Sequence, residues 1–148
     1  MKKVLKASVL FGVSMAIFLG FSPQNASAAW SSWQSFDGFK QGCKVRVYTD
    51  ATTYTRNAKT VDVKAEQNGN CGTIYYNMFL SWKGYPHTGL GENTPTGSFS
   101  SVTPLKSITI IRPIGEPSTW GLVYLEMKKS SNGDVIARAQ SPQLTFTE

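Results

Sequence analysis

The sequence has few of the side chains that build catalytic and metal sites. Its 148 residues include one histidine, His87, and two cysteines, Cys43 and Cys71, which are not spaced as CxxC. A structural zinc site needs four nitrogen or sulfur ligands, and a Ser-His-Asp triad would have to use His87 as its base. The G-x-S-x-G elbow, the phosphate-binding loop, the dinucleotide fingerprint and the EF-hand loop are also missing. We therefore predict a protein that is not an enzyme and has no catalytic residues, metal ligands or cofactor.

A strong charge of one sign is missing as well. The chain has 15 basic and 9 acidic residues and a formal net charge of +6, but three of the lysines lie within the first six positions. Without those three, twelve basic residues face nine acidic ones and the net charge is +3. A nucleic-acid-binding protein usually carries a denser basic stripe, so we expect no nucleic-acid partner. Mild attraction to an anionic surface such as a cell wall stays open, beside an ordinary soluble surface of mixed charge.

The single long apolar run lies near the N-terminus. Three lysines precede the run, which covers residues 7–21, and the small-residue motif Ala26-Ser27-Ala28 follows it. This order is typical of a secretory signal peptide, and about 15 apolar residues are short for a membrane span, which needs roughly 20. The segment resembles the signal peptides of Gram-positive secreted proteins. The resemblance implies export and says nothing about activity. We predict a signal peptide at 1–28, cleavage near Ala28, and a secreted, extracellular product.

Cleavage of the 148-residue chain after Ala28 leaves residues 29–148, or 120 residues, which suits a single domain. An even number of cysteines in an exported chain predicts a disulfide, here Cys43–Cys71. The C-terminus has no hydrophobic tail. We therefore expect a freely secreted bacterial protein without a stable membrane anchor, with a periplasmic location left open.

Helical periodicity is missing from residues 29–148, and period-two alternation takes its place. Val45 and Val47 alternate with Lys44, Arg46 and Tyr48, as in a strand with one buried face. The pair Asn68-Gly69 predicts a type I′ hairpin turn that joins residues 60–67 to residues 71–82. Further strands are expected at 98–102, 107–112, 120–128, 135–139 and 144–146, with a second hairpin turn at 130–133. The pattern predicts an all-β fold, an antiparallel β-sandwich of about seven to eight strands, with a small β-barrel as the alternative.

The two cysteines create a conflict of phase within residues 71–82. If Cys43 faces the core, a bonded Cys71 should do so too, and strict alternation would then turn Ile74 and Leu80 outward. These two residues share a face with other large apolar side chains, which suggests the opposite. A β-bulge at Gly72 would shift the phase by one residue and remove the conflict.

Aromatic side chains on outward strand faces are the remaining candidates for function. The alternation places Tyr48, Tyr75, Trp120 and Tyr124 there, with Lys44, Arg46 and Lys128 near some of them. Flat rings with a polar tip stack on sugars and hydrogen-bond to hydroxyl groups. We predict a non-catalytic binding protein that recognises a cell-wall or extracellular polysaccharide surface through these four ligand-binding residues. Ordinary packing of half-buried rings is the alternative.

Two other segments suggest other functions. Residues 83–97 form a Gly/Pro-rich loop of about 15 residues, a length that is often functional, and such a loop would be the contact surface of a secreted enzyme inhibitor. Trp30, Trp33, Phe36 and Phe39 recur every three residues. They either plug one end of the sandwich or form an aromatic surface for a ligand or a membrane, as in an antimicrobial or toxin-like protein.

Overall fold

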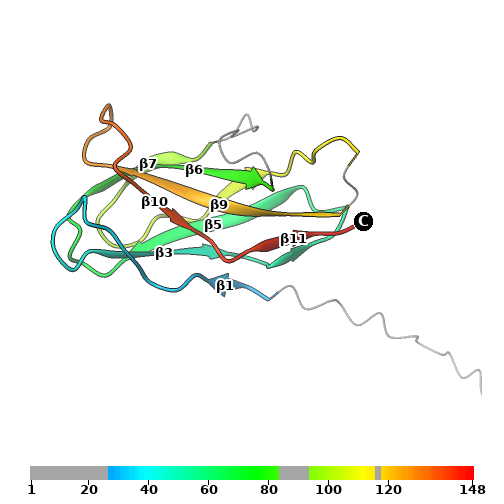
Figure 1. Cartoon of the computed structure of the whole chain (residues 1–148), viewed down its shortest axis with the longest axis horizontal. Coiled ribbons are helices and arrows are strands. Elements are labelled where there is room, and N and C mark those ends of the chain that lie inside the picture. Colours follow the sequence, from blue (N-terminus) through cyan, green and yellow to red (C-terminus); the bar gives the residue numbers. More distant parts are fainter. Residues whose placement is uncertain (1–26, 84–93, 116–117) are drawn as a thin grey trace, which may run out of the picture.

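Two β-sheets packed face to face make up the described part of the chain, and no helix occurs in it (Figure 1). The structure is a computed structural model that describes residues 27–83, 94–115 and 118–148. Sheet A contains β1 (Ala29–Trp30), β2 (Gln34–Ser35), β3 (Lys44–Thr49), β5 (Thr60–Gln67) and β8 (Lys106–Thr109). Sheet B contains β4 (Thr53–Tyr54), β6 (Ile74–Trp82), β7 (Thr96–Phe99), β9 (Thr119–Lys128), β10 (Ala137–Gln140) and β11 (Leu144–Phe146).

The predicted all-β sandwich is confirmed, and the two open sheets exclude the barrel alternative. Three of the described strands, β1, β2 and β4, have two residues each, and the others are longer. All strand pairs are antiparallel except β4 with β11, which is parallel. The alternative of a closed barrel fails because sheet A ends at β8 and sheet B at β7.

Period-two alternation places one face of each long strand in the core. Val45 and Val47 of β3 are fully buried, while Arg46 and Tyr48 between and after them are half-buried on the outer face. The same alternation holds along β5 and β9, and along β6 as far as Leu80, after which Ser81 and Trp82 are both buried. The largest fully buried side chains are Phe146, Ile74, Met78, Leu125, Met127 and Leu144. The residues of intermediate burial on the outer faces are therefore available as candidates for a binding surface.

The predicted hairpin between residues 60–67 and 71–82 is wrong. β5 pairs with β3 and β8 in sheet A, whereas β6 pairs with β7 and β9 in sheet B. Asn68 does not adopt the positive φ that a type I′ turn needs. Its side chain instead accepts a hydrogen bond from the Lys44 N–H at 3.1 Å and donates one to the Gly42 carbonyl at 2.8 Å. These bonds hold the chain where it crosses from one sheet to the other.

The phase shift expected at Gly72 is present, although not as a bulge in a paired strand. Cys71 and Ile74 are both buried, and Gly72 between them has a φ of 74°. Because β6 begins only at Ile74, the shift takes place in the crossover. The Gln67 side chain stabilises it by accepting a hydrogen bond from the Cys71 N–H at 3.1 Å and donating one to the Gly72 carbonyl at 2.6 Å.

The disulfide between Cys43 and Cys71 is confirmed. It links residues 28 positions apart, with Cα atoms 4.6 Å from each other, and both side chains are buried. Cys43 immediately precedes β3, and Cys71 lies in the crossover that leads to β6. The bond therefore ties the first long strand of sheet A to the entrance of sheet B.

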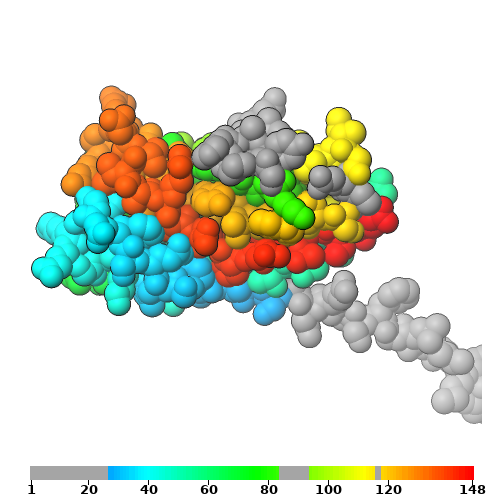
Figure 2. Space-filling model, viewed as in Figure 1, coloured from blue at the N-terminus to red at the C-terminus, as the bar shows by residue number. Residues whose placement is uncertain are grey.

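The N-terminal segment closes one side of the sandwich. β1 and β2 pair with β3, and the Gln34 side chain reaches across to sheet B, where its amide donates to the Gln140 carbonyl at 2.8 Å and accepts from the Gln140 N–H at 3.0 Å. In Figure 2 the blue and cyan residues of the N-terminal segment lie against the orange and red residues near the C-terminus. The second predicted hairpin is confirmed, since β9 and β10 pair antiparallel.

Candidate functional site

Three of the four predicted ligand-binding residues lie on the outer face of sheet B. Tyr75 on β6 is opposite Lys128 on β9, and Tyr124 on β9 is opposite Phe79 on β6. The rings of Phe79 and Tyr124 stack with their centroids 5.7 Å apart. Trp120 lies four residues before Tyr124 on the same strand, which corresponds to about 13 Å. The three rings therefore share a face without forming one contiguous platform.

A shallow hollow of about 420 Å³ lies beside Tyr75. Tyr75 and Asn77 of β6, Thr96 and Ser98 of β7, and Lys128 of β9 line it. Its lining combines apolar surface with polar side chains and one cation, so it offers hydrogen-bonding groups beside the Tyr75 ring. The expected proximity of Tyr75 and Lys128 is present here.

Tyr48, the fourth predicted residue, lies on the opposite side of the sandwich. It is on the outer face of β3 in sheet A, paired with Trp30 of β1 on one side and Lys64 of β5 on the other. A rigid flat ligand surface cannot contact Tyr48 together with the sheet B rings, because the two sheets and the core lie between them. The four residues thus belong to two separate candidate surfaces.

The sheet A surface contains a cluster that the sequence did not predict as a unit. The guanidinium carbon of Arg46 lies 4.4 Å from the ring centroid of Trp30 and 4.5 Å from that of Trp33. Both distances are in the range of cation–π contacts. We refer to Trp30, Trp33, Arg46, Tyr48, Lys64 and Glu66 as the tryptophan–arginine cluster.

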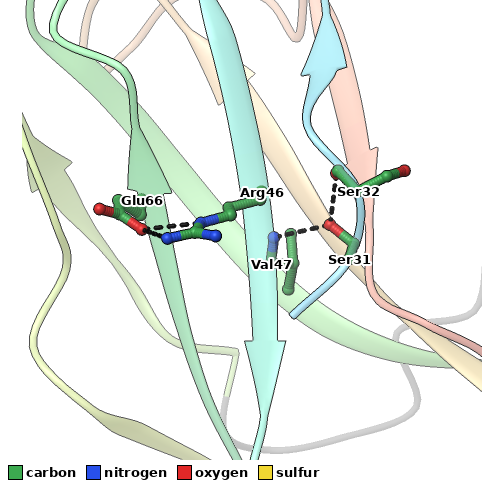
Figure 3. A network of polar contacts seen from close by, with 5 residues as sticks. All are labelled: Ser31, Ser32, Arg46, Val47 and Glu66. Atoms are coloured by element: carbon green, nitrogen blue, oxygen red, sulfur yellow. Dashed lines mark hydrogen bonds and ion pairs between the residues drawn. The ribbon is translucent and has the colours of Figure 1, made fainter. Parts of the chain in front are cut away.

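Glu66 holds the Arg46 side chain across the two strands. Its Oε2 atom lies 2.6 Å from Nη2 and 2.8 Å from Nε of Arg46, as Figure 3 shows. On the other side of β3, the Ser31 hydroxyl accepts a hydrogen bond from the Val47 N–H at 3.0 Å. These contacts fix the segment that carries the two tryptophans to the strand that carries Arg46.

Lys64 completes the cluster as a second cation. Its Nζ atom lies 4.7 Å from the ring centroid of Tyr48 and 5.6 Å from that of Trp30, and the Trp30 and Tyr48 rings are tilted against each other at 5.2 Å. Within the described residues Lys64 forms no ion pair, whereas the charge of Arg46 is matched by Glu66. The cluster thus combines three aromatic rings with one paired and one unpaired cation.

The four aromatic residues at the N-terminus of the domain divide between the two roles considered for them. Phe36 and Phe39 pack against the core, as expected for a plug. Trp30 and Trp33 lie on the outer face instead, and Trp33 is 41% exposed. The sequence pattern did not reveal that β1 and β2 pair with β3. Only this pairing brings Trp30 and Trp33 to Arg46.

Within residues 27–83, 94–115 and 118–148, no group of three or more His, Cys, Asp or Glu side chains is placed to hold a metal ion. The same residues contain no helix that is long and apolar enough to span a membrane. His87 and most of the 83–97 loop lie outside the described residues, as does the predicted signal peptide up to residue 26. The predictions for these segments remain predictions.

Comparison with known proteins places the chain in a family. The model of the YqgA MG2 macroglobulin domain matches residues 26–147. The cell wall-binding protein YqgA of Bacillus subtilis (strain 168) is 39% identical over 123 residues, which cover 79% of this chain and 83% of that protein. No solved structure matches the chain significantly. The match over most of its length shows that the chain belongs to the family of YqgA MG2 macroglobulin domains.

Proposed function

We propose that this chain is an exported, non-catalytic protein that binds the bacterial cell wall through aromatic side chains on the outer faces of its sandwich. The observation that carries the proposal is the set of half-buried and exposed rings on these faces, with Tyr48 beside Lys64 and Tyr75 beside Lys128. The relative from Bacillus subtilis, which is named for cell-wall binding, supports the same function. Tyr48, Tyr75, Trp120 and Tyr124 are the proposed contact residues.

Aromatic rings suit a polysaccharide ligand for a physical reason. One face of a pyranose ring carries mostly C–H groups, which pack well on an aromatic surface, while its hydroxyl groups need hydrogen-bonding partners around the ring. Tyrosine and tryptophan provide both and lose little side-chain entropy on binding. Half-buried rings lose even less, because the sheet already restricts their movement.

Export is part of the proposal. The first described strand, β1, begins at Ala29, directly after the predicted cleavage site. The disulfide suits an oxidising, extracellular environment. Mass spectrometry of the protein recovered from the culture medium tests this proposal. We expect the mass of a chain that begins at Ala29. Recovery of the uncut chain from the cytoplasm would contradict export.

A pull-down on purified cell wall and on a panel of polysaccharides tests binding itself. We expect the wild-type protein to be retained on the wall, and retention on no polymer would reject the proposed function. Measurement at about 0.05 M and about 0.5 M NaCl separates charge from ring stacking, because salt screens only the former. A protein that leaks lipid vesicles instead would support the membrane-active alternative.

Single alanine substitutions then identify the face that contacts the wall. Loss of retention in Tyr48→Ala indicates sheet A, and loss in Tyr75→Ala, Trp120→Ala or Tyr124→Ala indicates sheet B. The matched control is Ile114→Ser, which removes an apolar side chain that is fully exposed and not aromatic. The proposal expects this control to bind like the wild type. If all four alanine variants also bound as well as the wild type, these rings would not be the contacts.

A further inference from the structure

We infer that the wall-binding site lies on sheet A, where the tryptophan–arginine cluster binds the sugar rings of a polysaccharide, with one ring stacked on Trp33. This inference rests on the proposed cell-wall binding and adds to it the site and the chemical class of the ligand. The ligand is a glycan that is recognised by its pyranose rings rather than by charged substituents.

Trp33 is the most accessible ring for stacking. It is 41% exposed, and every other aromatic side chain of the described residues is half-buried or buried. On sheet B the ring of Tyr124 already stacks on Phe79. A sugar could therefore pack on the exposed part of Trp33 while the Arg46 contact stays in place.

The Trp33 side chain is supported from within the cluster. The Arg46 guanidinium lies 4.5 Å from its ring centroid, and Glu66 fixes that guanidinium through two contacts to a single carboxylate oxygen. Because the arginine is planar, it stacks on an indole and still presents N–H groups at its edge. This support orders the ring before a ligand arrives and so reduces the entropy that binding would cost.

Hydrogen-bonding groups of both kinds surround the rings. Lys64 provides a donor over the Tyr48 ring, and no described carboxylate forms an ion pair with it. Glu66 provides an acceptor, since both contacts of its carboxylate with Arg46 go to Oε2 and leave Oε1 without a partner in the described part of the chain. Sugar hydroxyls both donate and accept, so this mixture suits them.

The charges on this face nearly cancel, which favours an uncharged sugar ligand over a phosphate-rich polymer. The outward positions of β3 and β5 carry three cations and two anions, a net charge of +1: Lys44, Arg46 and Lys64 against Asp62 and Glu66. Attraction to an anionic polymer would therefore be weak and short in range. Stacking and hydrogen bonding remain as the main contributions, and these depend little on salt.

The decisive variant is Trp33→Ala, and the control is Ile114→Ser, which removes a fully exposed side chain that is not aromatic. The ligand is purified wall glycan from which phosphodiester-linked polymers and peptides have been removed. We expect Trp33→Ala to weaken binding by about tenfold, or about 1.4 kcal/mol, and Ile114→Ser to leave it within about twofold. We also expect the affinity of the wild type to change by less than about threefold between about 0.05 M and 0.5 M NaCl.

The outcomes separate this inference from the proposed function. If the wild type binds intact wall and Trp33→Ala binds equally well, cell-wall binding stands and the site assigned here is wrong. If stripping the phosphodiester polymers abolishes binding of the wild type, the ligand class is wrong. If the wild type binds no wall material at all, the proposed function itself fails.

A second measurement avoids any dependence on the folding of a variant. Soluble glycan fragments are added to the isotope-labelled wild-type protein, and the indole N–H signals of Trp33 and Trp120 are followed by NMR. The inference expects the Trp33 signal to shift with fragment concentration while the Trp120 signal stays in place. A shift of the Trp120 signal alone would show that the site is on sheet B and that its assignment to sheet A is wrong.

Discussion

At the residue scale, Tyr54 shows how one buried hydroxyl connects three strands. The Tyr54 hydroxyl donates a hydrogen bond to Oδ1 of Asp50 at 2.7 Å and accepts one from the Ala51 N–H at 3.2 Å. The same Asp50 oxygen accepts from the Asp62 N–H at 2.9 Å. Burial raises the pKa of Tyr54, and the hydrogen bond and negative charge of Asp50 raise it further. The neutral phenol is therefore the form that stabilises the end of β3 against β4 and β5.

Replacing Tyr54 by phenylalanine should remove these bonds and keep the ring, which stacks on Phe146 with centroids 5.3 Å apart. We expect the free energy of unfolding at pH 7 to fall by about 1–2 kcal/mol. Since the folded-state pKa lies above the unfolded value of about 10, the contribution of Tyr54 is complete below that pH and is lost as the pH rises further.

Urea denaturation of wild type and Tyr54→Phe at pH 7 and pH 11 measures this difference. The advantage of the wild type should shrink by about 1.4 kcal/mol at pH 11, because the unfolded state then releases the Tyr54 proton. Other tyrosines titrate in both proteins and cancel in the comparison. An advantage that stays constant from pH 7 to pH 11 would contradict the raised pKa.

At the element scale, the sequence predicted strand faces well and strand partners less well. Alternation assigned the buried and outward residues of β3, β5 and β9 correctly, because side chains of a strand point to opposite faces in turn. The pairing of β5 with β6 was wrong, because Asn68-Gly69 favours a tight turn only when the two flanking strands stay in one sheet. The choice between a hairpin and a crossover depends on packing between distant strands, which a local motif does not report.

Gly121 is an element-scale feature that the sequence pattern did not reveal. It is buried in β9, and a Cβ atom built on it would lie 2.7 Å from the Ser81 carbonyl oxygen of the neighbouring β6. We expect Gly121→Ala to lower the free energy of unfolding by about 1–3 kcal/mol, because backbone has to move to relieve the overlap.

Thermal and urea denaturation of Gly121→Ala check this expectation. Gly69→Ala is not a suitable control, because Gly69 has a positive φ. A better control is Ser107→Ala on the outer face of β8, where the side chain is exposed and donates a hydrogen bond to Asp62. Equal stability of Gly121→Ala and wild type would show that the two strands adjust without cost.

At the scale of the whole molecule, the sandwich was predictable and the candidate site only in pieces. Alternation, turn residues and two cysteines in a chain with a signal-like N-terminus were sufficient for the fold class and the disulfide. For the site, Arg46 and Tyr48 were recognised as outward, and Trp30 and Trp33 as a separate aromatic pattern. Their union depends on the N-terminal segment turning back along β3, which no local periodicity specifies.

The disulfide ties the start of β3 in sheet A to the crossover that leads into sheet B, and its removal tests the architecture. We expect the double variant Cys43→Ala/Cys71→Ala to lose about 3–4 kcal/mol of unfolding free energy. In the wild type the bond restrains a loop of this length in the unfolded chain, and the variant lacks that restraint. The total stability of a domain is about 5–15 kcal/mol, so the variant should stay folded but unfold at much lower urea.

Two further measurements show where that loss arises. The m-value should rise in the double variant, because an unfolded chain without the cross-link exposes more surface. Wild-type protein treated with a reductant is the control, since it keeps both sulfur atoms and loses only the bond. If reduced wild type remained as stable as the oxidised form while the double variant was destabilised, packing of the two buried side chains rather than the cross-link would hold the sheets together.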